Sequence, residues 1–199
     1  VLDSSNSKLP YNYISSIAID PLGNKWIGTL KGGVVKYDDS KFEIFNTKNS
    51  GLAADQISAI SVDESGNKWI GTHDAGLVKY DNKSWTVFNT SNSPLPHNKV
   101  YAISIDPTGT IWVGTFGGGL AKYDGVEWTV YNTENSGIPD NNINSIWIDD
   151  DDNKWIGTNN GLAKFNNDNW KVYTRENSKL PFNRIISIAV DGKGNKWIG

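Results

Sequence analysis

The chain has 199 residues and a formal net charge of −3, and it contains nine Trp and eight Tyr but neither Cys nor Met. The acidic balance supplies no basic surface, so we expect no nucleic-acid partner. The absence of Cys excludes disulfides, thiolate metal sites and a cysteine nucleophile. No apolar stretch is long enough to cross a bilayer, so we expect no membrane insertion by this segment. The density of large aromatic residues favours β structure.

The N-terminal part of the chain predicts four short strands separated by turns. Residues 14–19 ("ISSIAI") are apolar with small residues interleaved, which predicts a strand buried on both sides. Asp, Pro and Gly at 20–24 supply a tight turn, and "LKGG" at 30–33 supplies a glycine-rich one. The other strands are expected at 25–29, 34–37 and 42–45, and no segment shows helical periodicity.

The same unit recurs along the chain. The Trp of "NKWIG", or of its variant "TIWVG", falls at 26, 69, 112, 155 and 197, at intervals of 43, 43, 43 and 42 residues. A period in the forties is typical of propellers and solenoids, and four antiparallel strands per unit favour radial packing over an open solenoid. We therefore predict an all-β protein, a β-propeller with four full four-stranded antiparallel blades and the first two strands of another. The segments are a partial lead-in at 1–13, repeats at 14–56, 57–99, 100–142 and 143–184, and a partial repeat at 185–199.

Two series of aromatic residues follow the repeat. The first, expected to pack one blade on the next, comprises Trp26, Trp69, Trp112, Trp155 and Trp197. The second, in the fourth strand of each unit, comprises Phe42, Trp85, Trp128 and Trp170. Three explanations stay open for the partial last unit: a segment of a longer propeller with further blades, a ring completed by another copy of the chain, or a piece cut without regard to blade boundaries. We favour the first and expect the final strand to pair with material outside residues 1–199.

The repeat resembles a known family. The pattern "LPxNxIxxIxxDxxGNxWIGTxxGLxKYD", read at 95–124 or at 9–38, is similar to the two-component regulator propeller repeat, which builds sensor regions of hybrid histidine kinases and occurs in secreted proteins of Bacteroidetes. The resemblance covers all 199 residues. It implies a propeller in the periplasm or outside the cell, and ligand recognition, often of carbohydrate fragments. It supplies no catalytic motif.

Candidate binding residues lie in two sets of loops that we expect to open on one face: those between second and third strands, and those joining one blade to the next. Positions that differ between units are the ones a ligand can use, although such variation also fits unconstrained surface. Their aromatic rings, amides and charges suit a carbohydrate or a peptide. The candidates are Tyr11, Tyr13, Lys31, His73, Asp74, His97, Lys99, Phe116, Asn142, Asn159, Asn160, Phe182 and Arg184.

The fourth unit has two further peculiarities. Trp147 occupies a position that is Ala or Ser in the other units, so it either packs into a gap or projects toward the propeller channel as a further candidate site residue. The run "IDDDDNK" at 148–154 raises the alternative of a calcium site, because clustered carboxylates are suitable ligands for hard cations. In register, however, Asp152 replaces a turn glycine, and we interpret the run as a turn that requires positive φ. No metal site is predicted.

We expect an extracytoplasmic ligand-recognition propeller without catalytic activity or cofactor, the input region of a two-component signalling protein. The alternative is a structural or adhesive interaction propeller of a secreted protein. A propeller lyase that uses His73 and His97 ranks third among the hypotheses, because no catalytic sequence motif surrounds either residue.

Overall fold

The computed structural model describes residues 2–199, and residue 1 of the lead-in lies outside them. These residues form strands, turns and loops without any helix, so none of them forms a helix able to span a membrane. The strands are β1 (Ile14–Ile19), β2 (Lys25–Thr29), β3 (Val34–Tyr37), β4 (Phe42–Phe45), β5 (Ile57–Val62), β6 (Lys68–Thr72), β7 (Leu77–Tyr80), β8 (Trp85–Phe88), β9 (Val100–Ile105), β10 (Ile111–Thr115), β11 (Leu120–Tyr123), β12 (Trp128–Tyr131), β13 (Ile143–Ile148), β14 (Lys154–Thr158), β15 (Gly161–Asn166), β16 (Asn169–Tyr173), β17 (Ile188–Val190) and β18 (Lys196–Ile198).

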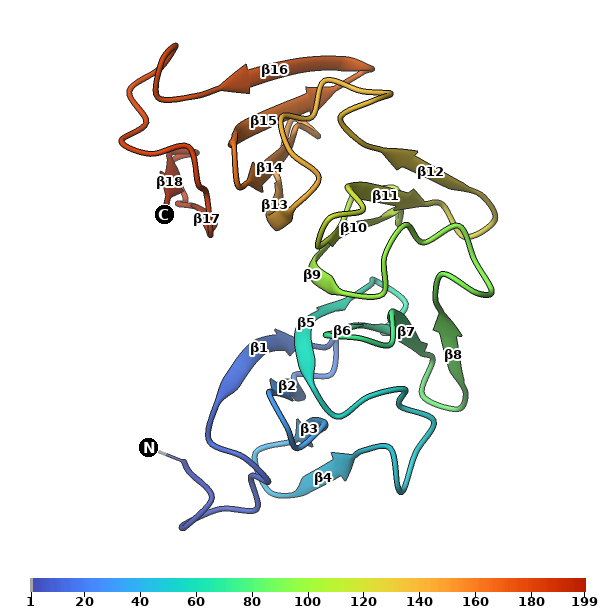
Figure 1. Cartoon of the computed structure of the whole chain (residues 1–199). Helices are drawn as coiled ribbons and strands as arrows, with labels where there is room; N and C mark the ends of the chain where they lie inside the picture. Colours follow the sequence, from blue (N-terminus) through green and yellow to red (C-terminus); the bar gives the residue numbers. More distant parts are fainter. Residues whose placement is uncertain (1) are drawn as a thin grey trace. The chain divides into compact units, whose positions relative to one another are not determined.

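The strands form antiparallel sheets in which neighbours in sequence are neighbours in space (Figure 1). Four sheets have four strands each, β1–β4, β5–β8, β9–β12 and β13–β16, and we call them blades 1 to 4. Strands β17 and β18 form a two-stranded sheet. The predicted propeller of four full blades and two further strands is confirmed, and the four strands predicted in the first unit agree with β1–β4 at both ends.

Each tight turn between the first two strands of a blade is held by its Asp. In blade 1 the Asp20 carboxylate accepts hydrogen bonds from the backbone N–H groups of Leu22 and Asn24, each at 3.0 Å. Gly23 lies between them at φ 83°, a conformation that glycine adopts without strain. Asp152 has φ 61° at the same position in blade 4. The prediction that this turn requires positive φ is therefore confirmed.

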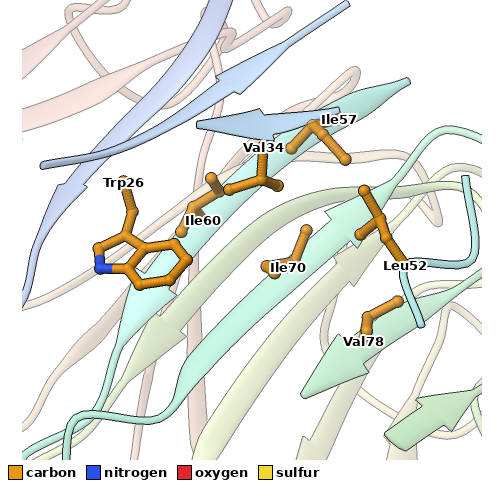
Figure 2. Close-up of a cluster of buried hydrophobic side chains, with 7 residues drawn as sticks. All are labelled: Trp26, Val34, Leu52, Ile57, Ile60, Ile70 and Val78. Carbon is orange, nitrogen blue, oxygen red and sulfur yellow. The ribbon is translucent and has the colours of Figure 1, made fainter. Parts of the chain in front are cut away.

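The chain divides into two compact units: residues 2–93 with 98–100, and residues 94–97 with 101–199. In the first unit the core lies between blades 1 and 2 (Figure 2). Trp26 and Val34 of blade 1 pack with Ile57 and Ile60 of β5, and the Trp26 ring is only 1% exposed. In the second unit Trp112 belongs to the corresponding cluster between blades 3 and 4. Packing of Trp26 and Trp112 against the next blade is as predicted.

Two expectations about burial are wrong. Strand β1 was expected to be buried on both sides, but Ile17 and Ile19 are 61% and 64% exposed. The equivalent of Ile17 in blade 2 is Ile60, which is 6% exposed because blade 1 covers it; residues 2–199 place no such blade over β1. Trp197, at the other end of the array, is 65% exposed for the same reason.

The second aromatic series forms cross-strand pairs inside each blade. The ring of each fourth-strand aromatic stacks or tilts against the ring opposite it on the third strand. The ring centroids are 4.3 Å apart for Tyr37–Phe42, 4.2 Å for Tyr80–Trp85, 4.6 Å for Tyr123–Trp128 and 4.5 Å for Phe165–Trp170.

Candidate functional site

Backbone hydrogen bonds join the two predicted loop sets along one edge of each blade. In blade 1 the N–H of Leu30 donates to the Tyr13 carbonyl at 3.1 Å, and the N–H of Gly33 donates to the Asp55 carbonyl at 2.9 Å. In blade 2 the N–H of Gly76 donates to the Asn98 carbonyl at 2.9 Å. We call this the loop edge, and we call the opposite edge, which carries the turns after the first and third strands, the turn edge. The structure therefore brings the two loop sets together as expected.

On the loop edge of blade 1, three of the predicted residues meet. The Tyr11 and Tyr13 rings are 5.5 Å apart and tilted by 36°, and the Lys31 ammonium lies 5.8 Å from the centre of the Tyr11 ring. Tyr13 is 66% exposed. Adjacent aromatic faces with a cation beside them can stack against the apolar face of a sugar or of a peptide side chain while the charge contacts a polar group.

The candidates of blade 2 and of the connection that follows it belong to two compact units. His73 is half-buried, and its N–H donates to the Gln56 carbonyl at 3.0 Å, which fixes its loop to the connection. Asp74 is exposed and Lys99 is half-buried in the same compact unit. His97 is half-buried but belongs to the second unit.

In the second unit, Phe116 and Asn142 come together on the loop edge through an isolated β-bridge. The Phe116 ring is 41% exposed and lies 5.5 Å from the ring of Tyr101. Asn159 accepts a hydrogen bond from the Asn144 amide at 3.0 Å. Tyr101 and Asn144 were not predicted, although both occupy the β-bulge position of the inner strand where other units carry Ser or Ile.

The remaining candidates are exposed residues. Asn160, Phe182 and Arg184 are exposed, and Phe182 is 71% exposed. Trp147 is 38% exposed and pairs with Trp155 close to the turn end of β13. It therefore lies near the turn edge, at the opposite end of the strand from Asn142 and Asn159.

A contact repeated in all five units was not predicted: the Trp of each "WIG" or "WVG" donates its indole N–H to the turn Asp six residues earlier. The signal was present in the sequence as a constant spacing. The nitrogen–oxygen distances are 2.9 Å for Trp26–Asp20, 3.1 Å for Trp69–Asp63, 3.0 Å for Trp112–Asp106, 2.8 Å for Trp155–Asp149 and 3.3 Å for Trp197–Asp191.

In blades 1 and 4, a lysine that follows in the next repeat covers this Trp–Asp pair. The Lys68 ammonium lies 4.4 Å from the centre of the Trp26 ring and 3.9 Å from the Asp20 carboxylate, and the Lys68 side chain is 2% exposed. Lys196 lies 5.3 Å from the Trp155 ring and 3.6 Å from the Asp149 carboxylate. Burial lowers the pKa of Lys68, although the charge of Asp20 opposes that effect. These contacts fasten one blade to the next.

The turn carboxylates already have hydrogen-bond or ion-pair partners within the protein. Burial raises the pKa of Asp149, but hydrogen bonds from Trp155 and Asn153 and the charge of Lys196 outweigh burial and leave the pKa below its ordinary value. Asp152 forms an ion pair with Lys154 at 2.7 Å. Residues 2–199 contain no group of three or more His, Asp or Glu side chains placed to hold a metal ion. The run at 148–154 is therefore explained as a turn.

Comparisons with known proteins extend this description. Residues 94–117 match the family model described as "Two component regulator propeller". The extracellular domain of a putative hybrid two component system from B. thetaiotaomicron is 30% identical, over 97% of this chain and 27% of that chain, with a TM-score of 0.85. A second such domain from the same organism is 25% identical, over 97% of this chain and 26% of that chain, with a TM-score of 0.78.

More distant structures share the fold. Virginiamycin B lyase from Staphylococcus aureus is 15% identical, over 94% of this chain and 62% of that chain, with a TM-score of 0.74. At that identity the likeness concerns the propeller architecture alone. The chain spans about a quarter of the length of the two extracellular domains. No curated protein matches it in sequence.

Proposed function

We propose that the chain is part of the extracytoplasmic input region of a signalling protein and that its loop edge recognises a carbohydrate or peptide ligand without transforming it. Residues 94–117 match the two-component regulator propeller model, which supports this proposal. The observation that carries this proposal is the 30% identity, over 97% of this chain, to an extracellular domain of a putative hybrid two component system. The location and the role are carried over from that similarity.

The loop edge of blade 1 offers the best-formed surface for such a ligand. The rings of Tyr11 and Tyr13 adjoin the Lys31 ammonium, and Tyr13 contributes a large exposed area that no fold contact requires. Stacking of a ligand on an exposed aromatic ring is worth about 0.5–1.5 kcal/mol beyond the area that it buries.

The test is a glycan and peptide array, followed by calorimetric titration of any ligand found. We expect Tyr13→Ala to weaken binding about tenfold, the equivalent of about 1.4 kcal/mol, and to leave the melting temperature unchanged because the ring is exposed. Leu22→Ala is the matched control, since Leu22 is 87% exposed on the turn edge of the same blade. Equal weakening by both variants, or no ligand on either array, would contradict the proposal.

Absence of catalysis is part of the same proposal. Incubating each ligand with the protein and analysing the products by mass spectrometry should return the ligand intact. Cleavage or elimination that disappears in His73→Ala or His97→Ala, with folding retained, would instead support the lyase hypothesis.

A second candidate function, a protein-interaction propeller, is favoured by one observation. Ile17 and Ile19 of β1 and Leu22 of the next turn expose 61%, 64% and 87% of their area, and contiguous exposed apolar surface is typical of protein contacts. Since Ile60, the equivalent of Ile17, packs against a neighbouring blade, the proposed partner is another β-blade, from further repeats or from a second copy. Light scattering across a concentration series tests it: Ile17→Lys should abolish self-association, and a monomer at every concentration would exclude a second copy.

A further inference from the structure

The turn edge of the second unit contains a cavity that the proposed function does not use. It has a volume of about 320 Å³ and lies between the turns of blades 3 and 4. Its walls include Asp106 and Thr110 from blade 3, Asp152 and Lys154 from β14 and the turn before it, and Asp168 from the turn after β15. Volumes of this order are typical of sites for small molecules.

The Lys154 ammonium in this cavity has unused hydrogen-bonding capacity. The residue is 7% exposed, and an ammonium group has three N–H donors. Its one polar partner among the residues that the structure describes is the Asp152 carboxylate, at 2.7 Å. The equivalent Lys68 instead contacts the Gly66 carbonyl, the Asn82 amide oxygen and Asp20. Because a buried ammonium is costly unless its donors are satisfied, Lys154 indicates an occupant.

Two more unused donors line the same cavity. Lys122 has no hydrogen bond or ion pair with any described residue, and its ammonium lies 5.9 Å from the centre of the Trp112 ring. The phenol of Tyr131 contacts aromatic rings but has no hydrogen-bond partner in the described chain. The equivalent positions in blades 1 and 2 are Phe45 and Phe88, so the fold does not require this hydroxyl.

The other side of the cavity supplies an acceptor. The Asp168 carboxylate is exposed at the cavity and forms no hydrogen bond or ion pair with the described residues, whereas Asp106 is occupied by Thr108, Thr110 and Trp112. Two residues that depart from the repeat also line this cavity: Thr110, where the other units have Asn, and Asp152, where they have Gly.

We propose that this cavity binds a small polar carboxylate that carries a neighbouring hydroxyl or ammonium group, with Lys122, Lys154 and Tyr131 contacting the carboxylate and Asp168 accepting from the neighbouring group. The ammonium groups and the phenol are donors that match carboxylate oxygens. This site is separate from the loop edge and does not depend on the ligand that binds there.

The test uses calorimetric or NMR titration of the chain with L-serine and L-lactate as probes, and with propionate and glucose as comparisons. We expect serine or lactate to bind saturably, propionate to bind at least several-fold more weakly because it lacks the neighbouring group, and glucose not to bind. Lys122→Met should weaken binding about tenfold or more, through loss of a charge-assisted hydrogen bond. The matched control is Lys164→Met, because Lys164 holds the same repeat position above Trp155, at 5.4 Å, outside the cavity.

Tyr131→Phe is a second variant, and its effect on probe binding cannot be attributed to misfolding, because other units of the chain carry Phe at this position. It should weaken probe binding several-fold with an unchanged melting temperature. Tyr13→Ala, on the loop edge, should leave probe binding unchanged, which separates this site from the proposed sensor function. Saturable binding of neither serine nor lactate, glucose binding that depends on Lys122, or equal effects of Lys122→Met and Lys164→Met would each overturn the proposal.

Discussion

At the scale of single residues, the bond between the turn Asp and the indole of the same repeat explains why both are present in every unit. In blade 1 the Asp20 carboxylate accepts from Leu22, Asn24 and Trp26 and faces Lys68 of the next blade. One carboxylate therefore closes a turn, satisfies a buried indole N–H and partners a buried ammonium.

Replacing this carboxylate should be costly. We expect Asp20→Ala to lower the free energy of unfolding by about 3 kcal/mol, because it leaves the Trp26 N–H buried without its acceptor and the buried Lys68 ammonium without its counter-charge. Asp38→Ala is the control: its carboxylate also accepts turn hydrogen bonds, but in an exposed turn. Chemical denaturation measures both, and a loss in Asp20→Ala no greater than in Asp38→Ala would contradict the role assigned to Asp20.

Acid should weaken the fold through the same carboxylates. Burial raises the pKa of Asp20 and of Asp106, but their hydrogen bonds outweigh burial and hold each pKa below its ordinary value. Hydrogen bonds from Asn195 lower the pKa of Asp191 to about 2. A carboxyl whose pKa is lowered on folding stabilises the protein above its unfolded-state pKa, and that stabilisation is lost as pH falls through the folded-state pKa.

The melting temperature should therefore be level near neutral pH and fall as the pH drops from about 4 toward 2. Circular dichroism melts across this range provide the measurement. A melting temperature that rises on acidification would contradict the assignment of these carboxylates.

Close approach of the blades depends on the glycine of "WIG". A Cβ added at Gly71 would lie 2.7 Å from Cγ1 and 3.2 Å from Cβ of Val100, inside their contact distance. We expect Gly71→Ala to cost about 1–3 kcal/mol through overpacking. Gly192→Ala is the control, since nothing lies within 4 Å of the Cβ it would add. Denaturant unfolding of both variants should show a large difference between them, and similar stabilities would count against the close packing at Gly71.

At the scale of elements, the strands could be predicted from the sequence, because a repeat of about 43 residues places the same residue types at equivalent positions in each unit. A turn Asp begins each hairpin, Gly follows three residues later in every unit except the fourth, and a strand with the indole comes next, so "DPLGNKWIG" at 20–28 predicts β2 and the turn before it. Burial was harder to predict. Ile17 and Ile60 hold the same repeat position, but their exposure differs because only Ile60 has a blade against it.

Trp147 shows how an element tolerates a residue outside the pattern. It is 38% exposed, and other units hold Ala or Ser at this position, whereas Trp112 is 2% exposed in a core cluster. We expect Trp147→Ala to cost less than about 1 kcal/mol and Trp112→Ala about 3–5 kcal/mol. Far-UV circular dichroism in denaturant distinguishes them, and comparable losses would show that Trp147 is a core residue.

The candidate site was predictable only in part. The sequence indicates which loops share an edge, because alternate connections of a four-stranded meander must do so. It does not indicate that Tyr11, Tyr13 and Lys31 meet, since that depends on side-chain directions. The turn-edge cavity was not predicted, because it depends on Lys154 pairing with Asp152 where Lys68 reaches a neighbouring carboxylate.

At the scale of the whole molecule, the two edges of the repeat differ in chemistry. The loop edge carries exposed aromatic rings beside a cation, while the turn edge carries the Asp–Trp contacts, the lysines that link two of them to the next blade and, in the second unit, a polar cavity. Under the proposed function, a ligand would bind on the loops, at the opposite edge from the lysine contacts that join the blades.

The most direct test of the sensor proposal is an NMR titration of isotope-labelled protein with the ligand that the arrays select. We predict saturable chemical-shift changes concentrated at loop-edge residues, led by Tyr11, Tyr13 and Lys31, with the turn-edge indole N–H signals of Trp26 and Trp112 unmoved. Changes confined to the turn edge, or spread evenly over both edges, would contradict the assignment of the loop edge as the recognition surface.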